Sequence, residues 1–227
     1  AAVALKRASL LEDQRQKEKL VADLQIARKI QQSALPAKLP QFEGYDIAAH
    51  FSPADETGGD AFDVVDLNAH RLEDSGDAIS DAFIFMGDAT GHGVGPALSV
   101  VQVLAMARMG CRLDTPVDQI AFHINERLCT DLPVGRFVTA FLGQLDVETH
   151  QMHWVSAGQA PLVLIPVKGE AQVRNSNGMP FGIDDNFTPD PVEPFSFAPG
   201  DIFLLLSDGY YEALNEEGQM FGHTRAI

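Results

Sequence analysis

The sequence contains few cysteines and no cysteine-rich metal motif. Cys111 and Cys129 are the only two, and neither belongs to a CxxC pair, so their spacing argues against a zinc or iron–sulfur centre. Both fall on apolar stretches with helical spacing, where cysteine is typically a small buried residue. Because nothing indicates a disulfide scaffold, we expect a reducing, cytoplasmic location.

Long apolar runs and positive charge are also scarce. No run of about 18 apolar residues occurs and no signal peptide is recognisable, so we expect no membrane span. Sixteen Lys and Arg face 32 Asp and Glu, which gives a net charge of −16 and a pI near 4.6. This balance argues against a nucleic-acid partner, because nothing offsets the repulsion from phosphates. The acidic excess is ordinarily a solvated surface, but some carboxylates could instead bind divalent cations.

Three common signatures are absent from the sequence: a Ser–His–Asp elbow, a Walker loop and a GxGxxG dinucleotide pattern. The chain of 227 residues has instead 45% apolar residues. That is enough for a substantial core, in one large domain or in one domain plus an appendage.

Residues 1–34 favour one long helix, because helix formers dominate and neither Gly nor Pro occurs before Pro36. The repeat fades upstream, at Asp13 and Lys17, so a helix packed on its own domain and a coiled-coil dimer are equally open. The chain begins without Met inside this pattern, so we expect a fragment of a longer protein. The seam of the dimer alternative has a four–three spacing, at Leu20, Leu24, Ala27, Gln31 and Ala34.

Beyond the helix, the periodicity predicts an α+β chain. Strands, then helices, then many strands indicate two stacked, mostly antiparallel sheets flanked by helices rather than a βαβ repeat. An acidic solvent loop is expected at 68–81. The expected helices are 96–112 and 116–130, with a short one opening at 210–214. The expected strands are 45–52, 64–67, 82–86, 137–146, 150–156, 162–167, 195–197 and 201–206.

Three aspartates flanked by glycine stand where strands or loops end: Asp60, Asp88 and Asp208. One such turn alone is equally well explained by an Asp that caps the next helix. Three together favour a metal site, because converging carboxylates repel one another unless cations lie between them. Oxygen ligands with few His or Cys select Mg²⁺, Mn²⁺ or Ca²⁺. Two such ions can activate a water molecule for attack on phosphorus.

Six motifs in this order resemble the metal-dependent serine/threonine protein phosphatases (PPM, or type 2C), in particular their bacterial SpoIIE/RsbU-like branch. The junction Ile30–Pro36 is also similar to the entry of that branch, so the resemblance runs from about residue 25 to the end. The motifs are Gly58-Gly59-Asp60, Gly87-Asp88-Ala89-Thr90-Gly91-His92-Gly93, Phe137-Val138-Thr139, Ala157-Gly158-Gln159-Ala160-Pro161, Met179-Pro180-Phe181-Gly182, and Ser207-Asp208-Gly209 with Glu212.

The resemblance implies a centre of two Mn²⁺ or Mg²⁺ ions at one edge of a β-sandwich. Asp88 would bridge the ions, the backbone carbonyl of Ala89 would add a ligand, and Asp208 would bind one ion. Asp60 would bind an ion or orient a water molecule on one. The implied reaction is one-step hydrolysis of phosphoserine or phosphothreonine by a metal-activated water, without a phosphoenzyme.

The resemblance also implies partners and a domain plan. The substrate in this branch is usually a small phosphorylated anti-sigma-factor antagonist, and the phosphatase is usually fused to an upstream sensory or receiver domain. Residues 1–36 would then be a helical linker that transmits the signal. Residues 37–227 would be the phosphatase-like domain.

Several positions depart from the family pattern and keep a second hypothesis open. Gln159 stands where the branch often has His, and the family's last metal-binding Asp would follow Ile227, so we expect the domain to lack its C-terminal end. Arg136 is a candidate phosphate clamp or a solvated Arg, and His92 is a proton donor to the leaving oxygen or a structural residue. The alternative function is therefore a catalytically weak, phosphatase-like module that captures a regulatory partner.

Overall fold

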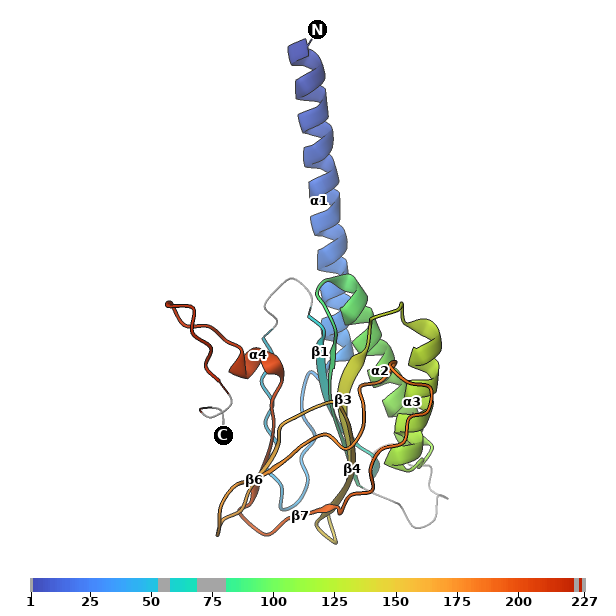
Figure 1. Ribbon diagram of the computed structural model, residues 1–227, viewed down its shortest axis with the longest axis vertical. Coiled ribbons are helices and arrows are strands. Elements are labelled where there is room, and N and C mark those ends of the chain that lie inside the picture. The colour runs from blue at the N-terminus through green and yellow to red at the C-terminus, as the bar shows by residue number, and fades with distance from the viewer. Residues whose placement is uncertain (1, 53–57, 69–80, 223–224, 226–227) are drawn as a thin grey trace.

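Figure 1 shows a long helix that projects from a body of sheets and packed helices. The computed structural model describes residues 2–52, 58–68, 81–222 and 225. In chain order its elements are α1 (Ala2–Ala34), β1 (Asp60–Asp66), β2 (Ala82–Ala89), α2 (Val94–Arg112), α3 (Val117–Asp131), β3 (Val138–Asp146), β4 (Gln151–Ala157), β5 (Leu162–Ile165), β6 (Gln172–Arg174), β7 (Phe195–Ser196), β8 (Ile202–Leu205) and α4 (Asp208–Tyr211).

The strands form two sheets in which every pairing is antiparallel. The larger sheet has the order β1-β2-β3-β4-β7, and the smaller has the order β6-β5-β8. Helices α2 and α3 pack on the larger sheet, as Figure 1 shows. The predicted α+β fold with antiparallel sheets and an N-terminal helix is therefore confirmed.

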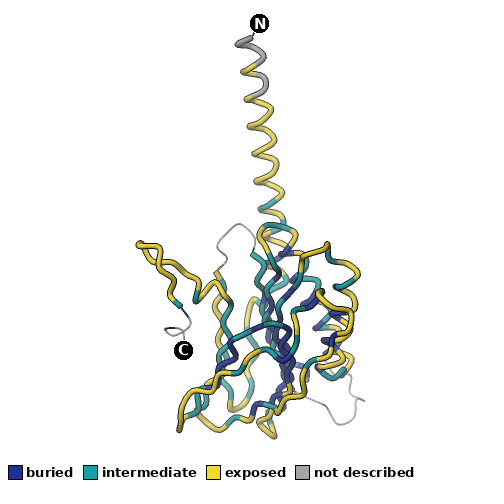
Figure 2. Tube along the Cα trace, in the orientation of Figure 1, coloured by how far each residue is buried: buried dark blue, intermediate teal, exposed yellow. Residues whose placement is uncertain are grey.

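Successive side chains of the central strands belong alternately to two separate hydrophobic cores. Val138, Ala140 and Leu142 of β3 belong to the core under α2 and α3. Phe141 and Leu145 of the same strand belong to the core between the sheets. Because successive side chains of a strand point to opposite faces, a strand buried on both faces reads as one apolar run. The dark-blue centre of Figure 2 marks this layered interior.

Aromatic rings fill the space between the sheets. Phe195 of β7 lies with its ring centroid 4.7 Å from that of Phe203 in β8 and 5.2 Å from that of Trp154 in β4. Phe141 stacks near Trp154, with ring centroids 6.3 Å apart. Aromatic pairs at these separations add a directional term to the burial of their area. They hold the smaller sheet against the larger one.

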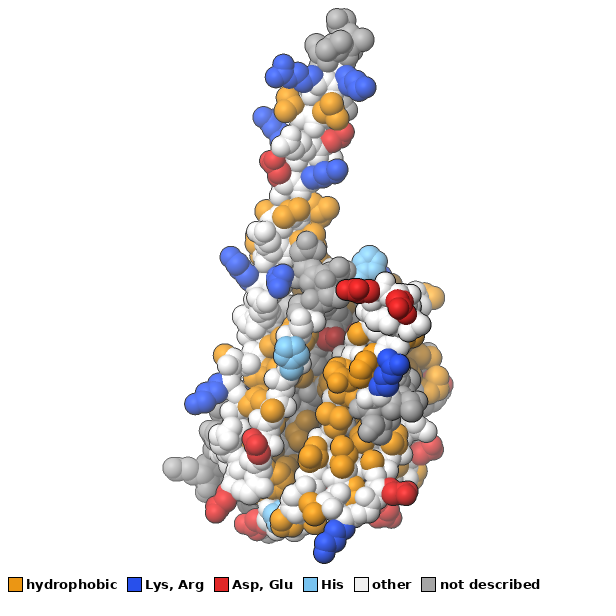
Figure 3. Space-filling view, turned by 90° about the vertical axis from the view of Figure 1, so that its left-hand side faces the viewer, with side chains coloured by type: hydrophobic (Ala, Val, Ile, Leu, Met, Phe, Trp, Pro, Cys, Tyr) orange, Lys and Arg blue, Asp and Glu red, His pale blue; other side chains and the backbone are white. Residues whose placement is uncertain are grey.

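The outward face of the smaller sheet exposes apolar side chains. Figure 3 looks at the side of the molecule where α4 and β6 lie, and hydrophobic side chains gather there. Val173 of β6 and Ile202 of β8 are among the exposed apolar residues of this sheet. Among the described elements, α2 and α3 make the main contacts between helices and strands, and these contacts are with the larger sheet.

Helix α1 packs on the body only near its C-terminal end. Leu20 is 60% exposed, Ile26 is 57% exposed, and the shaft is yellow over most of its length in Figure 2. Packing on its own domain therefore accounts for the last turns of α1 and leaves its upper apolar residues uncovered. The dimer seam stays a prediction, because the structure describes a single chain.

Helix α2 is the one described helix that is long and apolar enough to cross a membrane. Its buried residues include Val100, Leu104 and Ala107, and they belong to the core against the larger sheet. Core helices commonly have this composition, and the packing of α2 accounts for it.

Several predicted boundaries were wrong. Residues 46–52 form no strand, because only Tyr45 pairs, with Phe42, across the turn at Gly44. Strand β1 begins four residues before the expected 64, since Asp60 already pairs with Asp88. The short strand β6 was missed, and α4 begins at Asp208 rather than at 210. Most of the expected acidic loop, residues 69–80, lies outside the described residues.

Candidate metal and active site

Asp60 and Asp88 face each other across the first two strands. Asp60 is the first residue of β1, Asp88 is the penultimate residue of β2, and the two are direct cross-strand partners. Directly opposed residues of an antiparallel pair place their side chains on the same face at close range. The register of β1 and β2 therefore brings together two carboxylates that lie 28 positions apart in the sequence.

Gly59 leaves room for the two groups that the resemblance assigns to the metal. A Cβ at this position would overlap the carbonyl oxygen of Ala89 and would lie 2.6 Å from Oδ1 of Asp88. The amide N–H of Ala89 donates a hydrogen bond of 3.0 Å to the carbonyl of Gly59. Only glycine allows the backbone to approach this closely, so the Gly58-Gly59 pair positions the turn against both candidate ligands.

Asp208 reaches the same site from the smaller sheet. Strand β8 ends at Leu205, and Asp208 opens α4 two residues after Leu206. A side-chain hydrogen bond from Ser207 to Asp60 links the two segments. The three sequence-predicted aspartates are therefore brought together from β1, β2 and the end of β8.

Crowding and burial raise the pKa values of two of these carboxyl groups. The pKa of Asp88 is raised to about 7, first by burial and then by the negative charges of Asp60 and Asp208. The pKa of Asp60 is raised to about 6 by burial and by the charge of Asp208, although the hydrogen bond from Ser207 lowers it. Burial and mutual repulsion disfavour the ionised forms of both carboxyl groups, and a bound cation would offset that repulsion.

An unpaired oxygen supports the same conclusion. Oδ1 of Asp60 is buried and has no hydrogen-bond partner. A buried polar atom without a partner is costly and calls for an explanation such as an ion. Asp60, Asp88, Ala89 and Asp208 carry oxygen donors, the ligand type that Mn²⁺ and Mg²⁺ prefer. Among the described residues, however, no three His, Cys, Asp or Glu side chains lie close enough to hold one ion.

Two buried glutamines hold the backbone around the site, and local sequence patterns predict neither role. Gln31 of α1 donates to the carbonyls of Gly58 and Asp60 at 2.7 and 3.2 Å, and its Oε1 accepts from the N–H of Gly58. Gln159 donates to the carbonyl of Leu206 at 2.9 Å and accepts from the hydroxyl of Thr139. The only sequence signal for Gln31 is that it is a polar residue in the four–three spacing of the predicted helix seam.

The hydroxyl of Thr139 completes a chain of contacts across the site. Its single proton is shared between Oε1 of Gln159 at 3.4 Å and the backbone carbonyl of Asp88 at 3.3 Å. Since Gln159 also holds the carbonyl just before Ser207, this chain connects the Asp88 turn to the Asp208 turn. Gln159 therefore has a structural role here.

Arg136 and His92 lie beside the turn that follows Ala89. Nη1 of Arg136 donates a hydrogen bond of 2.5 Å to the carbonyl of Thr90. His92 is exposed and lines a small pocket together with Arg136. Arg136 is therefore exposed and at the same time bound to a backbone carbonyl. The structure leaves the role of His92 as a proton donor untested.

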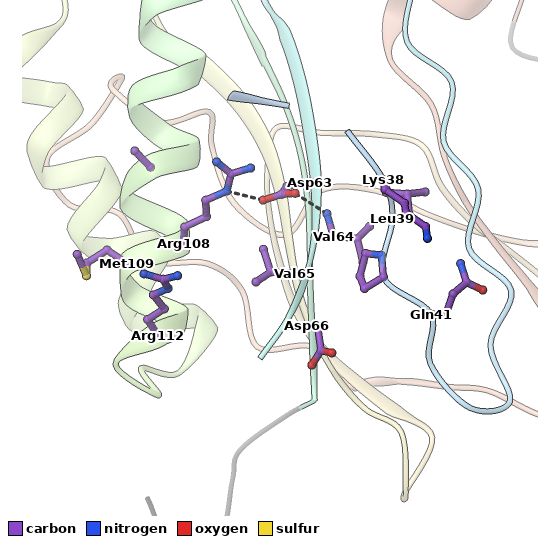
Figure 4. A pocket seen from close by; sticks show the side chains of 12 residues that line it. Lys38, Leu39, Gln41, Asp63, Val64, Val65, Asp66, Arg108, Met109 and Arg112 are labelled. Carbon is purple, nitrogen blue, oxygen red and sulfur yellow. Dashed lines mark hydrogen bonds and ion pairs between the residues drawn. The ribbon is translucent and has the colours of Figure 1, made fainter. Parts of the chain in front are cut away.

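A cavity lined by other residues lies apart from the three aspartates. It has a volume of about 810 Å³ and runs along β1, between α2 and residues 38–41 (Figure 4). Its centre is the ion pair of Asp63 with Arg108, whose Nε–Oδ2 distance is 2.5 Å. The other Asp63 oxygen accepts the N–H of Val64 at 2.9 Å. The lining of this cavity includes Asp63 and Asp66 but none of Asp60, Asp88 and Asp208.

The chain is similar in sequence to two curated bacterial proteins over most of its length. Phosphoserine phosphatase RsbU of Bacillus subtilis is 26% identical over 204 residues, which cover 88% of this chain and 57% of RsbU. Protein IcfG of Synechocystis sp. is 24% identical over 232 residues, 90% of this chain and 35% of IcfG. The chain thus spans less than two thirds of the length of either relative.

Solved structures show the same fold. The SiaA-PP2C domain of Pseudomonas aeruginosa superimposes with a TM-score of 0.69 at 24% identity, covering 92% of this chain and 80% of that one. The PP2C phosphatase domain of SpoIIE from Bacillus subtilis gives a TM-score of 0.55 at 17% identity, covering 68% of this chain and 42% of that one. The family model described as Stage II sporulation protein E (SpoIIE) matches residues 80–227, and the chain therefore belongs to the SpoIIE family.

Proposed function

We propose that this chain is a metal-dependent protein phosphatase that hydrolyses phosphoserine or phosphothreonine on a small regulatory protein. The observation that carries the proposal is the convergence of Asp60, Asp88 and Asp208, with the raised pKa values of the first two. Membership of the SpoIIE family and the name of its relative RsbU, a phosphoserine phosphatase, support the same reaction.

The proposed cofactor is a pair of Mn²⁺ or Mg²⁺ ions. Asp88, the carbonyl of Ala89 and Asp208 would hold the ions, and Asp60 would hold an ion or orient a water molecule. Bound ions would offset the carboxylate charges, polarise the phosphoryl group and lower the pKa of the attacking water. The chain itself fixes its oxygen donors through Gly59, Gln31 and Gln159.

The proposed setting is bacterial signalling in the cytoplasm. The substrate would be a phosphorylated protein of the anti-sigma-factor antagonist type. Residues 1–36 would be a linker from an upstream sensory or receiver domain to the phosphatase-like domain at 37–227. The hydrogen bonds from Gln31 to Gly58 and Asp60 support this plan, because they join the last turns of α1 directly to the start of β1.

The test is phosphate release from a phosphoserine peptide with and without millimolar Mn²⁺. Turnover should require Mn²⁺ and should fall at least a hundredfold in Asp88→Asn, because that carboxylate would contact both ions. Asp118→Asn is the matched control, since Asp118 is exposed in the first turn of α3. Unchanged turnover in Asp88→Asn, or turnover without a divalent ion, would contradict the proposal.

A second candidate is a phosphatase-like module that only captures a partner. One observation favours it: the described residues hold no set of three metal-binding side chains around one point. Such a module should bind its phosphoprotein equally well with Mn²⁺ and with EDTA. Asp88→Asn should then leave the affinity unchanged, whereas in a phosphatase both changes should weaken binding of the phosphorylated form.

A further inference from the structure

A second, smaller pocket lies directly beside the candidate metal turn. It has a volume of about 390 Å³ and begins one residue after Ala89. The carbonyl of Ala89 faces Gly59, whereas the carbonyl of the next residue, Thr90, faces Arg136. The pocket is therefore next to the candidate metal site but separate from it. Its lining residues are Thr90, Gly91, His92, Gly135 and Arg136.

The guanidinium group of Arg136 is seated in this pocket. It occupies the space that a Cβ at Gly91 would take, and Gly91 has a φ of +95°, which also favours glycine. The carbonyl of Thr90 is the acceptor that the described residues provide for it. An arginine has five N–H donors in a planar fork, so one bond to a carbonyl fixes the group and leaves donors for a ligand.

The backbone around Arg136 is fixed as well. The N–H of Thr90 donates to the carbonyl of Phe137 at 3.0 Å, and the N–H of Phe137 donates to the hydroxyl of Thr90 at 3.1 Å. The N–H of Arg136 closes a turn with the carbonyl of Pro133. The position of Arg136 relative to the Asp88 turn is therefore set by two strand ends rather than by a free loop.

A planar guanidinium group fits a carboxylate in a two-pronged contact. In a chain with a net charge of −16, an acidic substrate needs a local cation to approach the three aspartates. An extended peptide advances about 3.3 Å per residue, so a residue one or two positions from the reacting one would lie within reach of a pocket beside Thr90.

We propose that Arg136, with His92 at its side, binds a carboxylate side chain next to the phosphorylated residue of the substrate. The proposal rests on the proposed phosphatase function and makes Arg136 a specificity residue rather than a clamp for the reacting phosphate. The ligand is an acidic residue within two positions of the phosphoserine or phosphothreonine.

The test measures binding, so that it does not depend on catalysis. Two fluorescent peptides carry a non-hydrolysable phosphonate analogue of phosphoserine, flanked by two residues on each side that are glutamate in one peptide and glutamine in the other. Dissociation constants are measured by fluorescence anisotropy with Mn²⁺ present. The proteins are the full chain, Arg136→Ala, Arg136→Lys and the control Arg127→Ala, whose arginine is exposed on α3 and paired with Asp131.

The full chain and Arg127→Ala should bind the glutamate peptide about two- to fivefold more tightly, the range of an exposed ion pair. Arg136→Ala should lose this preference and Arg136→Lys should keep part of it. Equal binding of the two peptides by the full chain, no binding of either, or a preference that persists in Arg136→Ala would overturn the proposal. If the preference follows this pattern but the matching phosphoserine peptides release no phosphate, the phosphatase function fails and the pocket stands.

Discussion

The ion pair between Asp63 and Arg108 should dominate the response of this fold to single charge changes. Asp63 is 3% exposed, whereas the Arg108 side chain is 36% exposed. Arg108 also donates from Nη2 to the carbonyl of Ala34 at 2.8 Å, at the end of α1. Removing Arg108 therefore leaves a buried carboxylate without its counter-charge. Removing the charge of Asp63 leaves a cation that water can reach.

The expected costs follow from this asymmetry. Arg108→Met should destabilise the fold by about 3 kcal/mol, the lower end of the range for an unpaired buried charge. Asp63→Asn should cost about 1 kcal/mol, because the amide oxygen can still accept the N–H of Val64. The double variant should be no less stable than Arg108→Met alone, since the uncompensated charge is gone. For a chain of this length, 3 kcal/mol corresponds to a Tm lowered by about 6 to 12 °C.

The assay is urea unfolding followed through the fluorescence of Trp154, the single tryptophan, which is 5% exposed between the sheets. The four proteins form a double-mutant cycle whose coupling term isolates the pair. If Arg108→Met proves less costly than Asp63→Asn, or if the coupling is near zero, the burial of Asp63 does not control the stability of this ion pair.

Three further predictions concern the metal site and the linker. In metal-free protein the raised pKa of Asp88 means that stability is lost as the pH rises from about 4 to about 7. Asp88→Asn should therefore raise the stability at pH 8 by about 1 kcal/mol, a value discounted for the partial exposure of Asp88. In thermal melts this gain should vanish near pH 4. Mn²⁺ should stabilise the parent chain more than the variant. Gly59→Ala should weaken Mn²⁺ binding at least tenfold by calorimetry, because its methyl group displaces the carbonyl of Ala89. Gly95→Ala, with open space around it and no positive φ, should not. Changing Leu20 and Leu24 to Gln should lower the sedimented mass if α1 forms a dimer seam; an unchanged mass would exclude the seam.

Local sequence patterns predicted the elements that depend on local interactions. The helices at 94–112 and 117–131 were located to within two residues, because their apolar spacing and their Gly and Pro boundaries are encoded nearby. The strand expected at 45–52 failed for the opposite reason. A strand requires a partner, and its alternating pattern finds none among the described residues. The start of β1 was likewise set by pairing with β2 rather than by its own composition.

The candidate ligands were predictable because glycine-flanked aspartates are a short-range signal, whereas the residues that position them were not. The side-chain hydrogen bonds of Gln31 and Gln159 span 20 to 47 positions. The apolar periodicity of a helix or strand does not predict hydrogen bonds between residues so far apart in the sequence. A glutamine can fix backbone carbonyls without bringing a positive charge next to the aspartates, and a positive charge there would compete with a bound cation. Gln159 is therefore a positioning residue, and its replacement should change metal affinity.

Gln159→Leu tests that role against a matched glutamine. Gln144 is also buried on the larger sheet, but it ties the N–H of Val117 and the carbonyl of Thr115 at the start of α3. Gln159→Leu and the control Gln144→Leu each leave buried backbone groups without a partner. Each should lower the free energy of unfolding in urea by about 1 to 3 kcal/mol. Only Gln159→Leu should also weaken Mn²⁺ binding, by about tenfold in calorimetric titration, since it alone releases the Asp208 turn from the Asp88 turn. Equal losses of metal affinity in the two variants would mean that general loosening of the sheet, and not the link through Gln159, sets the geometry of the site.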